Sequence, residues 1–288
     1  MLTKVALLIA VTVGLVSCSS EGTSQANGGR LRVATTTSLY DTGLWDVLEP
    51  LFEDRYGVAL DVISGGTGKA LEFGRRGDVD VLTIHDKARE ERFVADGYGV
   101  KRYPIAYNYF LIVGPQGDPA GIGGMGPEQA LLEVMKQGQA DPGRVWFVSR
   151  GDDSGTHARE KLLWQNAGQE YSSVRNSGAW YLEAGAGMGA ILVLTDEKSA
   201  YTLTDVGTYL AFQRDLGLVT LVDRGDTLLN VYSAIAINPE THPDANVEAA
   251  DKLIQFLLSA EVQDIIGGFG LNTYGTPLFT PARGQEPQ

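Results

Sequence analysis

Short apolar runs alternate with helical hydrophobic patterns along most of the chain. Strand-like runs are expected at 31–35, 58–64, 79–84, 106–113, 144–149, 200–203, 219–222 and 231–237. Apolar residues recur at helical spacing within 41–56, 69–76, 90–96, 127–137, 155–167, 187–197 and 246–258. Such alternation is typical of an α/β fold built on parallel sheets.

Two positions along this pattern indicate an inserted lobe. Turn-forming residues concentrate at 114–119, directly after a strand, and a second clear strand begins near Asn230. We expect the chain to start in one lobe, cross to a second and return, so that lobe one comprises 30–113 and 230–288 and lobe two comprises 114–229. Two crossings with a cleft between the lobes would make a hinged clamp.

The N-terminal segment 1–17 has the features of a secretory signal. Lys4 precedes an apolar run at 5–16, which is shorter than the roughly 20 residues that span a bilayer. Cys18, the only cysteine, directly follows a small residue and cannot form an internal disulfide. The junction resembles a bacterial lipobox, which implies lipidation at Cys18; a transmembrane anchor with a spare cysteine is the alternative. Residues 18–29 read as a flexible tether.

The charge of the chain limits its partners. The net charge is −13, and removal of residues 1–17 takes away Lys4 and leaves about −14. So few cations cannot build a face for nucleic acid. Any bound anion would be repelled by the whole molecule, and its affinity must come from local hydrogen-bond donors and dipoles.

Three segments rich in hydroxyl groups and glycine each follow a predicted strand and precede a predicted helix, at 35–38, 64–68 and 149–157. Ligands of parallel α/β sheets bind beyond the carboxyl ends of the strands. Helix N-termini there offer free N–H groups and partial positive charge, and hydroxyls add further donors. Taken singly, each segment could be only a helix cap or a turn.

Arg150 is the permanent cation of the third segment and can place two N–H groups on an oxyanion. An ion pair with Asp152, Asp153 or Glu160 is the alternative. Asp152 and Asp153 would repel an oxyanion, so we expect them to cap the following helix or to hold Arg150.

The same residues form no recognisable catalytic site. His85, His157 and His242 are scattered, although His157 and Glu160 could be imagined as metal ligands on one helix. Neither a His-Glu-x-x-His nor a Gly-x-Ser-x-Gly motif is present, and Gly65–Lys69 does not complete a phosphate-binding loop. We therefore expect neither an enzyme nor a cofactor.

Several motifs together resemble the tungstate-binding proteins of bacterial ABC importers. The resemblance extends over nearly the whole chain after the signal segment. It rests on Thr-Thr-Thr-Ser at 35–38, Gly-Asp-Val-Asp-Val at 77–81, Ser-Arg-Gly-Asp-Asp-Ser-Gly-Thr-His at 149–157, Gly-Ala-Gly-Met-Gly at 185–189, Tyr-Thr-Leu-Thr-Asp at 201–205 and Asn-Val-Tyr-Ser at 230–233.

This resemblance implies a type II periplasmic-binding fold, with two lobes that are each a mainly parallel sheet flanked by helices. It implies an exported protein, attached to the membrane only through its lipid, that delivers tungstate to an ABC transporter permease. We expect a monomer. The oxyanion would be cargo, with no direct bond from the protein to the metal. The residues implied to hold it are Thr36, Thr37, Ser38, Thr67, Arg150 and Thr156.

Two alternatives stay open. Molybdate, phosphate or sulfate could be the ligand, and phosphate would be favoured by a carboxylate of Asp152 or Asp153 aimed into the cleft. A surface sensor or adhesin would be favoured by an outward Arg150 loop and a filled cleft. The segment 85–87 departs slightly from the family pattern, and we do not expect it to touch the ligand loops.

Overall fold

The structure is a computed structural model that describes residues 29–152 and 154–287. The predicted signal segment, Cys18 and nearly all of the tether lie outside these residues, as does Asp153. Within the described part of the chain, no helix is long and apolar enough to cross a membrane.

The first half of the molecule is built on three parallel strands, β1 (Arg30–Thr36), β2 (Ala59–Gly65) and β3 (Val81–Ile84). Strand β1 lies in the middle, with β2 on one side and β3 on the other. The connections are helical, as the sequence predicts for parallel neighbours. Helices α1 (Thr37–Tyr40) and α2 (Leu44–Tyr56) connect β1 to β2, and α3 (Thr67–Arg76) connects β2 to β3. A further helix, α4 (Lys87–Ala95), follows β3.

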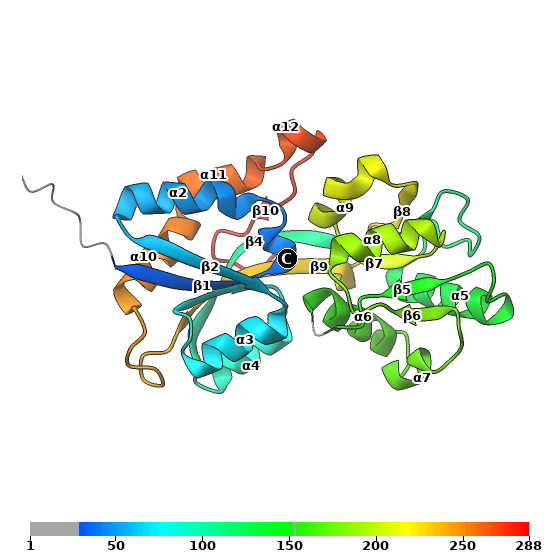
Figure 1. The fold of residues 1–288 in the computed structure, drawn as a ribbon, viewed down its shortest axis with the longest axis horizontal. Coiled ribbons are helices and arrows are strands. Elements are labelled where there is room, and N and C mark those ends of the chain that lie inside the picture. Colours follow the sequence, from blue (N-terminus) through cyan, green and yellow to red (C-terminus); the bar gives the residue numbers. More distant parts are fainter. Residues whose placement is uncertain (1–28, 153, 288) are drawn as a thin grey trace, which may run out of the picture.

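Two long strands join the halves (Figure 1). Strand β4 (Gly99–Pro115) pairs antiparallel with β9 (Leu229–Ile237), which pairs antiparallel with β3. The sheet is therefore mixed rather than mainly parallel, because β4 leads the chain away from the first half and β9 brings it back. The predicted strand at 106–113 was too short: polar residues and Pro104 interrupt the apolar pattern before it.

The far end of β4 carries the second half of the molecule. It pairs there with β7 (Thr202–Asp205) and β8 (Leu218–Val222), while β5 (Phe147–Ser149) and β6 (Tyr181–Glu183) form a separate parallel pair. The helical elements of this half are α5 (Pro127–Ala140), α6 (Gly155–Asn166), α7 (Tyr171–Arg175), α8 (Met188–Glu197), α9 (Val206–Phe212), and the short 3-10 turns η1 (Gln213–Asp215) and η2 (Asp226–Leu228).

The C-terminal segment returns to the first half, where Figure 1 shows it in orange and red beside α2. It consists of α10 (Val247–Leu258), α11 (Ala260–Gly268), α12 (Leu271–Tyr274) and β10 (Thr280–Pro281), and β10 pairs with β4.

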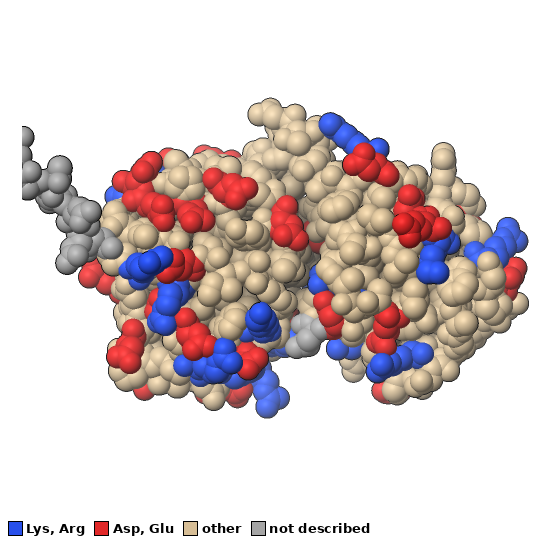
Figure 2. Space-filling view, in the orientation of Figure 1, with Lys and Arg blue, Asp and Glu red and all other residues tan. Residues whose placement is uncertain are grey.

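Each half has its own buried apolar core. In the first half one cluster surrounds Trp45 and Phe256, and another lies around Phe93. In the second half Trp164 is central to one cluster and Ile191 to another. The expected α/β class is confirmed, and the outer surface fits the acidic composition. On the face in Figure 2, basic side chains stand in small groups beside acidic ones, without a broad basic patch.

Candidate functional site

The carboxyl ends of the three parallel strands place several polar residues at one edge of the first half. Thr36 of β1 pairs with Gly65 of β2, and Thr35 pairs with Thr83 of β3. The residues that follow these strands therefore lie along one edge: the start of α1 with Thr37 and Ser38, the start of α3 with Thr67, and His85. Thr36, Ser38 and Thr67 are buried, and Thr37 is half-buried.

A second polar edge forms in the other half. Ser149 of β5 pairs with Glu183 of β6, so Arg150 and Gly185 emerge together, and the Gly185 N–H donates to the Arg150 carbonyl at 2.8 Å. Thr156 lies in the first turn of α6, and Asp205 ends β7.

The two edges press against each other through glycines. A Cβ placed on Gly155, the first residue of α6, would lie 2.7 Å from the His85 ring, and one on Gly207 of α9 would lie 3.0 Å from Thr42 Cγ2. At Gly155 a larger residue would force the His85 ring to move, and at Gly207 the contact would be tight. Thr36, Ser38, Thr67, Arg150 and Thr156 are no more than 5% exposed. The two halves therefore meet in a closed arrangement at these loops.

The helix starts at these edges differ in how they are capped. The side chains of Thr36, Ser154 and Asp205 accept hydrogen bonds from the first turns of α1, α6 and α9. Gly66 and Gly187, which precede α3 and α8, provide no side-chain cap. The first-turn N–H groups of α3 and α8 can therefore serve an anion.

Two of the five buried hydroxyls that lack a hydrogen-bond partner in the described residues lie at the starts of helices on these edges. Thr67 Oγ1 and Thr156 Oγ1 have no hydrogen-bond partner among the described residues. A buried polar atom without a partner costs about 1–3 kcal/mol, and folded proteins seldom keep one without a role. Each hydroxyl belongs to the first turn of a helix, Thr67 in α3 of the first half and Thr156 in α6 of the second.

Arg150 is buried and forms an ion pair with Asp152, one of the three carboxylates expected as possible partners. Its Nε and Nη2 lie 3.2 and 2.7 Å from Asp152 Oδ2, and the Ser154 N–H donates to Asp152 Oδ1 at 3.1 Å. Nη1 makes no hydrogen bond within the described chain. Arg150 is 5% exposed, so the outward loop that would favour the adhesin alternative is not observed.

His85 was missed as a site residue. Its Nε2 lies 2.9 Å from Ser38 Oγ and its Nδ1 lies 2.8 Å from Asn230 Oδ1. Burial lowers the pKa of His85 to about 4, the nearby charges of Arg159 and Arg150 act in the same direction, and the hydrogen bond with Asn230 opposes them. The expectation that 85–87 would not touch the ligand loops is therefore wrong for His85. Its position after the third parallel strand was the available signal.

His157 and Glu160, the two possible metal ligands on α6, form hydrogen bonds with other side chains of the protein. His157 Nε2 lies 2.7 Å from the Tyr171 hydroxyl. Glu160 accepts from Ser149 Oγ at 2.6 Å and from Trp164 Nε1 at 3.1 Å. Among residues 29–152 and 154–287, no three His, Cys, Asp or Glu side chains are grouped to hold a metal ion.

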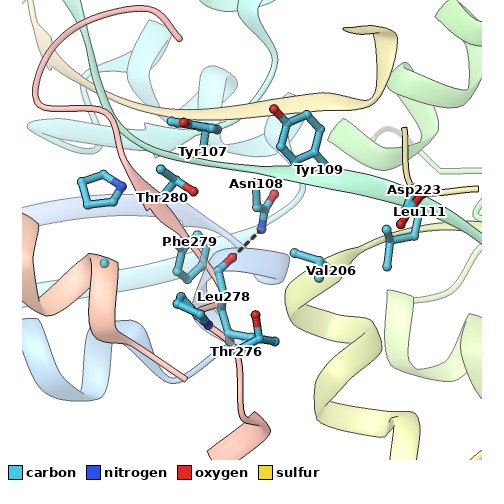
Figure 3. A pocket seen from close by; sticks show the side chains of 13 residues that line it. Tyr107, Asn108, Tyr109, Leu111, Val206, Asp223, Thr276, Leu278, Phe279 and Thr280 are labelled. Carbon is cyan, nitrogen blue, oxygen red and sulfur yellow. Dashed lines mark hydrogen bonds between the residues drawn. The ribbon is translucent and has the colours of Figure 1, made fainter. Parts of the chain in front are cut away.

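A pocket of about 410 Å³ lies on another part of the molecule, between β4, β10 and α9 (Figure 3). Tyr107, Tyr109, Val206 and Thr276 are among its lining residues. None of the six residues expected to hold an oxyanion lines it, so the pocket does not coincide with the junction of the polar edges.

Comparison with known proteins agrees with this architecture. Residues 20–261 match the model of the PBP superfamily domain. The tungstate-binding protein TupA of Peptoclostridium acidaminophilum is 41% identical over 281 residues, which cover 96% of this chain and 94% of that protein. The chain belongs to the tungstate-binding protein family.

Solved structures support this membership. The tungstate-binding protein TupA of Desulfovibrio alaskensis superposes with a TM-score of 0.74 at 41% identity, covering 88% of this chain and 99% of that one. The tungstate ABC transporter structure from Geobacter sulfurreducens gives a TM-score of 0.72 at 44% identity, covering 83% and 98%. The expected resemblance and the type II periplasmic-binding fold are thereby confirmed, and the relatives of the tungstate-binding protein family are named as binding proteins, not enzymes.

Proposed function

We propose that this protein captures tungstate outside the cytoplasm and delivers it to an ABC import permease. The observation that carries the proposal is the pair of buried, unpartnered hydroxyls, Thr67 Oγ1 and Thr156 Oγ1. Each comes from a different half of the molecule, and each lies in the first turn of a helix. The named function of close relatives over most of the chain supports tungstate as the ligand.

The oxyanion is proposed to be held by Thr36, Thr37, Ser38, Thr67, Arg150 and Thr156. The uncapped starts of α3 and α8 would add backbone N–H donors. All contacts would be hydrogen bonds to oxygen, so the protein forms no bond to the tungsten atom. Local donors suit a molecule whose net charge of −13 repels anions.

Binding is proposed to close a clamp. Lobe one would comprise 30–113 and 230–288, lobe two 114–229, and β4 and β9 would be the hinge strands. The glycine contacts at Gly155 and Gly207 would then be the closed-state contacts between the lobes.

We further propose that residues 1–17 direct export, that Cys18 carries the lipid anchor and that 18–29 form the tether. In this arrangement a monomer without catalytic activity or cofactor waits at the membrane and meets the permease there.

Molybdate is the competing ligand of the same class, since it matches tungstate in shape and charge. Phosphate is less suited to the site. A protonated phosphate needs a hydrogen-bond acceptor, and the Asp152 carboxylate is committed to Arg150 and to the Ser154 N–H.

Isothermal titration of residues 30–288 with tungstate, molybdate, sulfate and phosphate, in a buffer free of phosphate, tests the proposal. Tungstate is expected to bind more tightly than the other three. If only phosphate or sulfate gave a heat of binding, that anion would replace tungstate as the proposed ligand. No heat of binding from any of the four anions would refute an oxyanion site.

A further inference from the structure

A buried chain of hydrogen bonds runs from the hinge strands to the proposed ligand loop. Asn108 Nδ2 donates to the Leu278 carbonyl at 3.3 Å, the bond drawn in Figure 3. Asn230 Nδ2 donates to Asn108 Oδ1 at 2.9 Å. The Asn230 Oδ1 then faces His85 Nδ1, and His85 Nε2 faces Ser38 Oγ. The chain of bonds thus links β4, β9, the end of β3 and the start of α1.

The direction of every bond in this chain follows from its first member. A backbone carbonyl can only accept, so the Asn108 amide must turn its NH2 group toward Leu278. This orientation sets that of Asn230, whose oxygen requires a proton on His85 Nδ1. His85 Nε2 is then an acceptor, and the Ser38 hydroxyl must donate to it. A second acceptor, Thr36 Oγ1, is farther from Ser38 Oγ, at 3.3 Å.

This arrangement conflicts with a direct role for Ser38 as a donor to the ligand. Its only hydrogen is committed to His85, and its oxygen would present lone pairs to a tetrahedral dianion. A neutral histidine with Nδ1 protonated therefore leaves Ser38 unable to hydrogen-bond an oxyanion that is itself only an acceptor.

The charges around Arg150 also favour a gain of positive charge on binding. Arg150 is paired with Asp152, and the carboxyl groups of Asp41 and Asp205 lie within its electrostatic reach. Burial raises the pKa of both of these carboxyls, and Arg150 opposes the shift. A bound dianion would add two negative charges to a site whose main cation is already neutralised.

Two pockets reach the His85 side chain, which is otherwise buried. Pockets of about 380 and 220 Å³ both touch His85, Lys87 and Arg159. The centroid of the Tyr232 ring lies 4.8 Å from that of the imidazole. The remaining titratable groups that line these pockets are the carboxylates Asp86, Glu91, Asp226 and Glu286. Because these four carboxylates outnumber the two cations Lys87 and Arg159, the pockets suit the entry of a proton better than the entry of an anion.

We propose that oxyanion capture is coupled to the uptake of one proton from solvent at His85 Nε2, which reverses the Ser38–His85 hydrogen bond. The imidazolium then donates to Ser38 Oγ, and the Ser38 hydroxyl donates to an oxygen of the dianion. This inference rests on the proposed function and assigns His85 as a positioning residue of that site. The low pKa of the free histidine keeps it neutral until the ligand arrives.

Proton uptake can be counted directly. The full chain in detergent is titrated with tungstate at about pH 6.5, in two buffers of different ionisation enthalpy. The observed heats are expected to differ by an amount that corresponds to uptake of a large part of one proton. Because the pKa of His85 is about 4 without ligand and higher with it, affinity should fall as the pH rises between these two values, by up to tenfold per pH unit, and should level off above the bound-state value, where no proton is taken up.

His85→Gln separates this histidine from other titrating groups. Glutamine can accept from Ser38 and donate to Asn230 but cannot take up a proton, so uptake should vanish and the affinity should lose its pH dependence. His242→Gln, far along the chain in the first half, is the matched control and should behave as the wild type.

Three outcomes would overturn the proposal. Tungstate binding by the wild type without proton uptake would do so, and would leave the proposed function intact. Proton uptake that persists in His85→Gln would show that a group other than His85 takes up the proton. Loss of uptake in His242→Gln would show that the effect is not specific to His85. No binding of any oxyanion to the wild type would instead be a failure of the proposed function itself.

Discussion

The two polar edges that meet in this protein differ in how they carry charge. The first-half edge offers neutral groups: the hydroxyls of Thr36, Ser38 and Thr67, and a buried neutral histidine. The second-half edge carries Arg150, whose charge is balanced within its own loop by Asp152. An acidic protein can therefore offer donors to an anion without a net positive patch, because neutral donors come from both halves and the cation Arg150, in the second half, is balanced by its own loop.

The largest test of this comparison is removal of the cation. We expect Arg150→Ala to weaken tungstate binding by at least ~2 kcal/mol, or about 30-fold, because a charge-assisted contact is lost and Asp152 is left unpaired. Calorimetry measures the effect. Arg224→Ala, on an exposed side chain of the same half, should leave the affinity unchanged. Unchanged affinity in Arg150→Ala would remove Arg150 from the site.

The next test leaves every hydrogen-bond donor of the proposed site in place but pushes the two polar edges apart. Gly155→Ala places a methyl group 2.7 Å from the His85 ring, and overpacking of this kind costs about 1–3 kcal/mol. We expect binding about tenfold weaker and a more open scattering profile with ligand present. Gly268→Ala, where a Cβ meets no atom within 4 Å, is the control. A Gly155→Ala protein that closes and binds normally would show that this contact does not limit closure.

A smaller effect is expected at the two threonines whose hydroxyls have no hydrogen-bond partner within the protein. Thr67→Val and Thr156→Val should each weaken tungstate binding by about 1 kcal/mol, or roughly fivefold. Neither should lower the free energy of unfolding without ligand, because the hydroxyl removed has no partner. Titration and urea unfolding of the same samples measure both quantities. Loss of stability with unaltered affinity would make these threonines structural.

The smallest effect on affinity is expected where the hydroxyl already has a structural partner. Thr36→Val removes the side-chain cap of α1 and should lower the free energy of unfolding by about 1 kcal/mol. Its effect on tungstate affinity should be smaller than that of Thr67→Val. The reverse order would place Thr36 among the principal donors, and Thr208→Val, at an N-terminal turn of the other half, provides a comparison for stability alone.

The strand-and-helix alternation could be predicted because hydrophobic periodicity is a local property of the chain. Residues 35–38 and 64–68 were placed at the ends of parallel strands, and the register of β1 with β2 brings them to one edge. The start of α6 at Gly155 was also predicted, since a polar segment that can cap a helix precedes it. The antiparallel direction of β4 and β9 was not predicted, because the direction of a strand in a sheet depends on where the chain enters and leaves that sheet.

By itself, then, the sequence determined the α/β class, the loops that hold the polar residues, and the family. Only the tertiary structure decided which of those residues are paired. Arg150 binds Asp152 although three carboxylates were candidates, and His85 meets Asn230, 145 positions away in the chain. Whether a buried hydroxyl is committed, as in Ser38, or unpartnered, as in Thr67, depends on neighbours from distant segments. No local pattern encodes those neighbours, because burial and hydrogen bonding arise only when the two halves pack together.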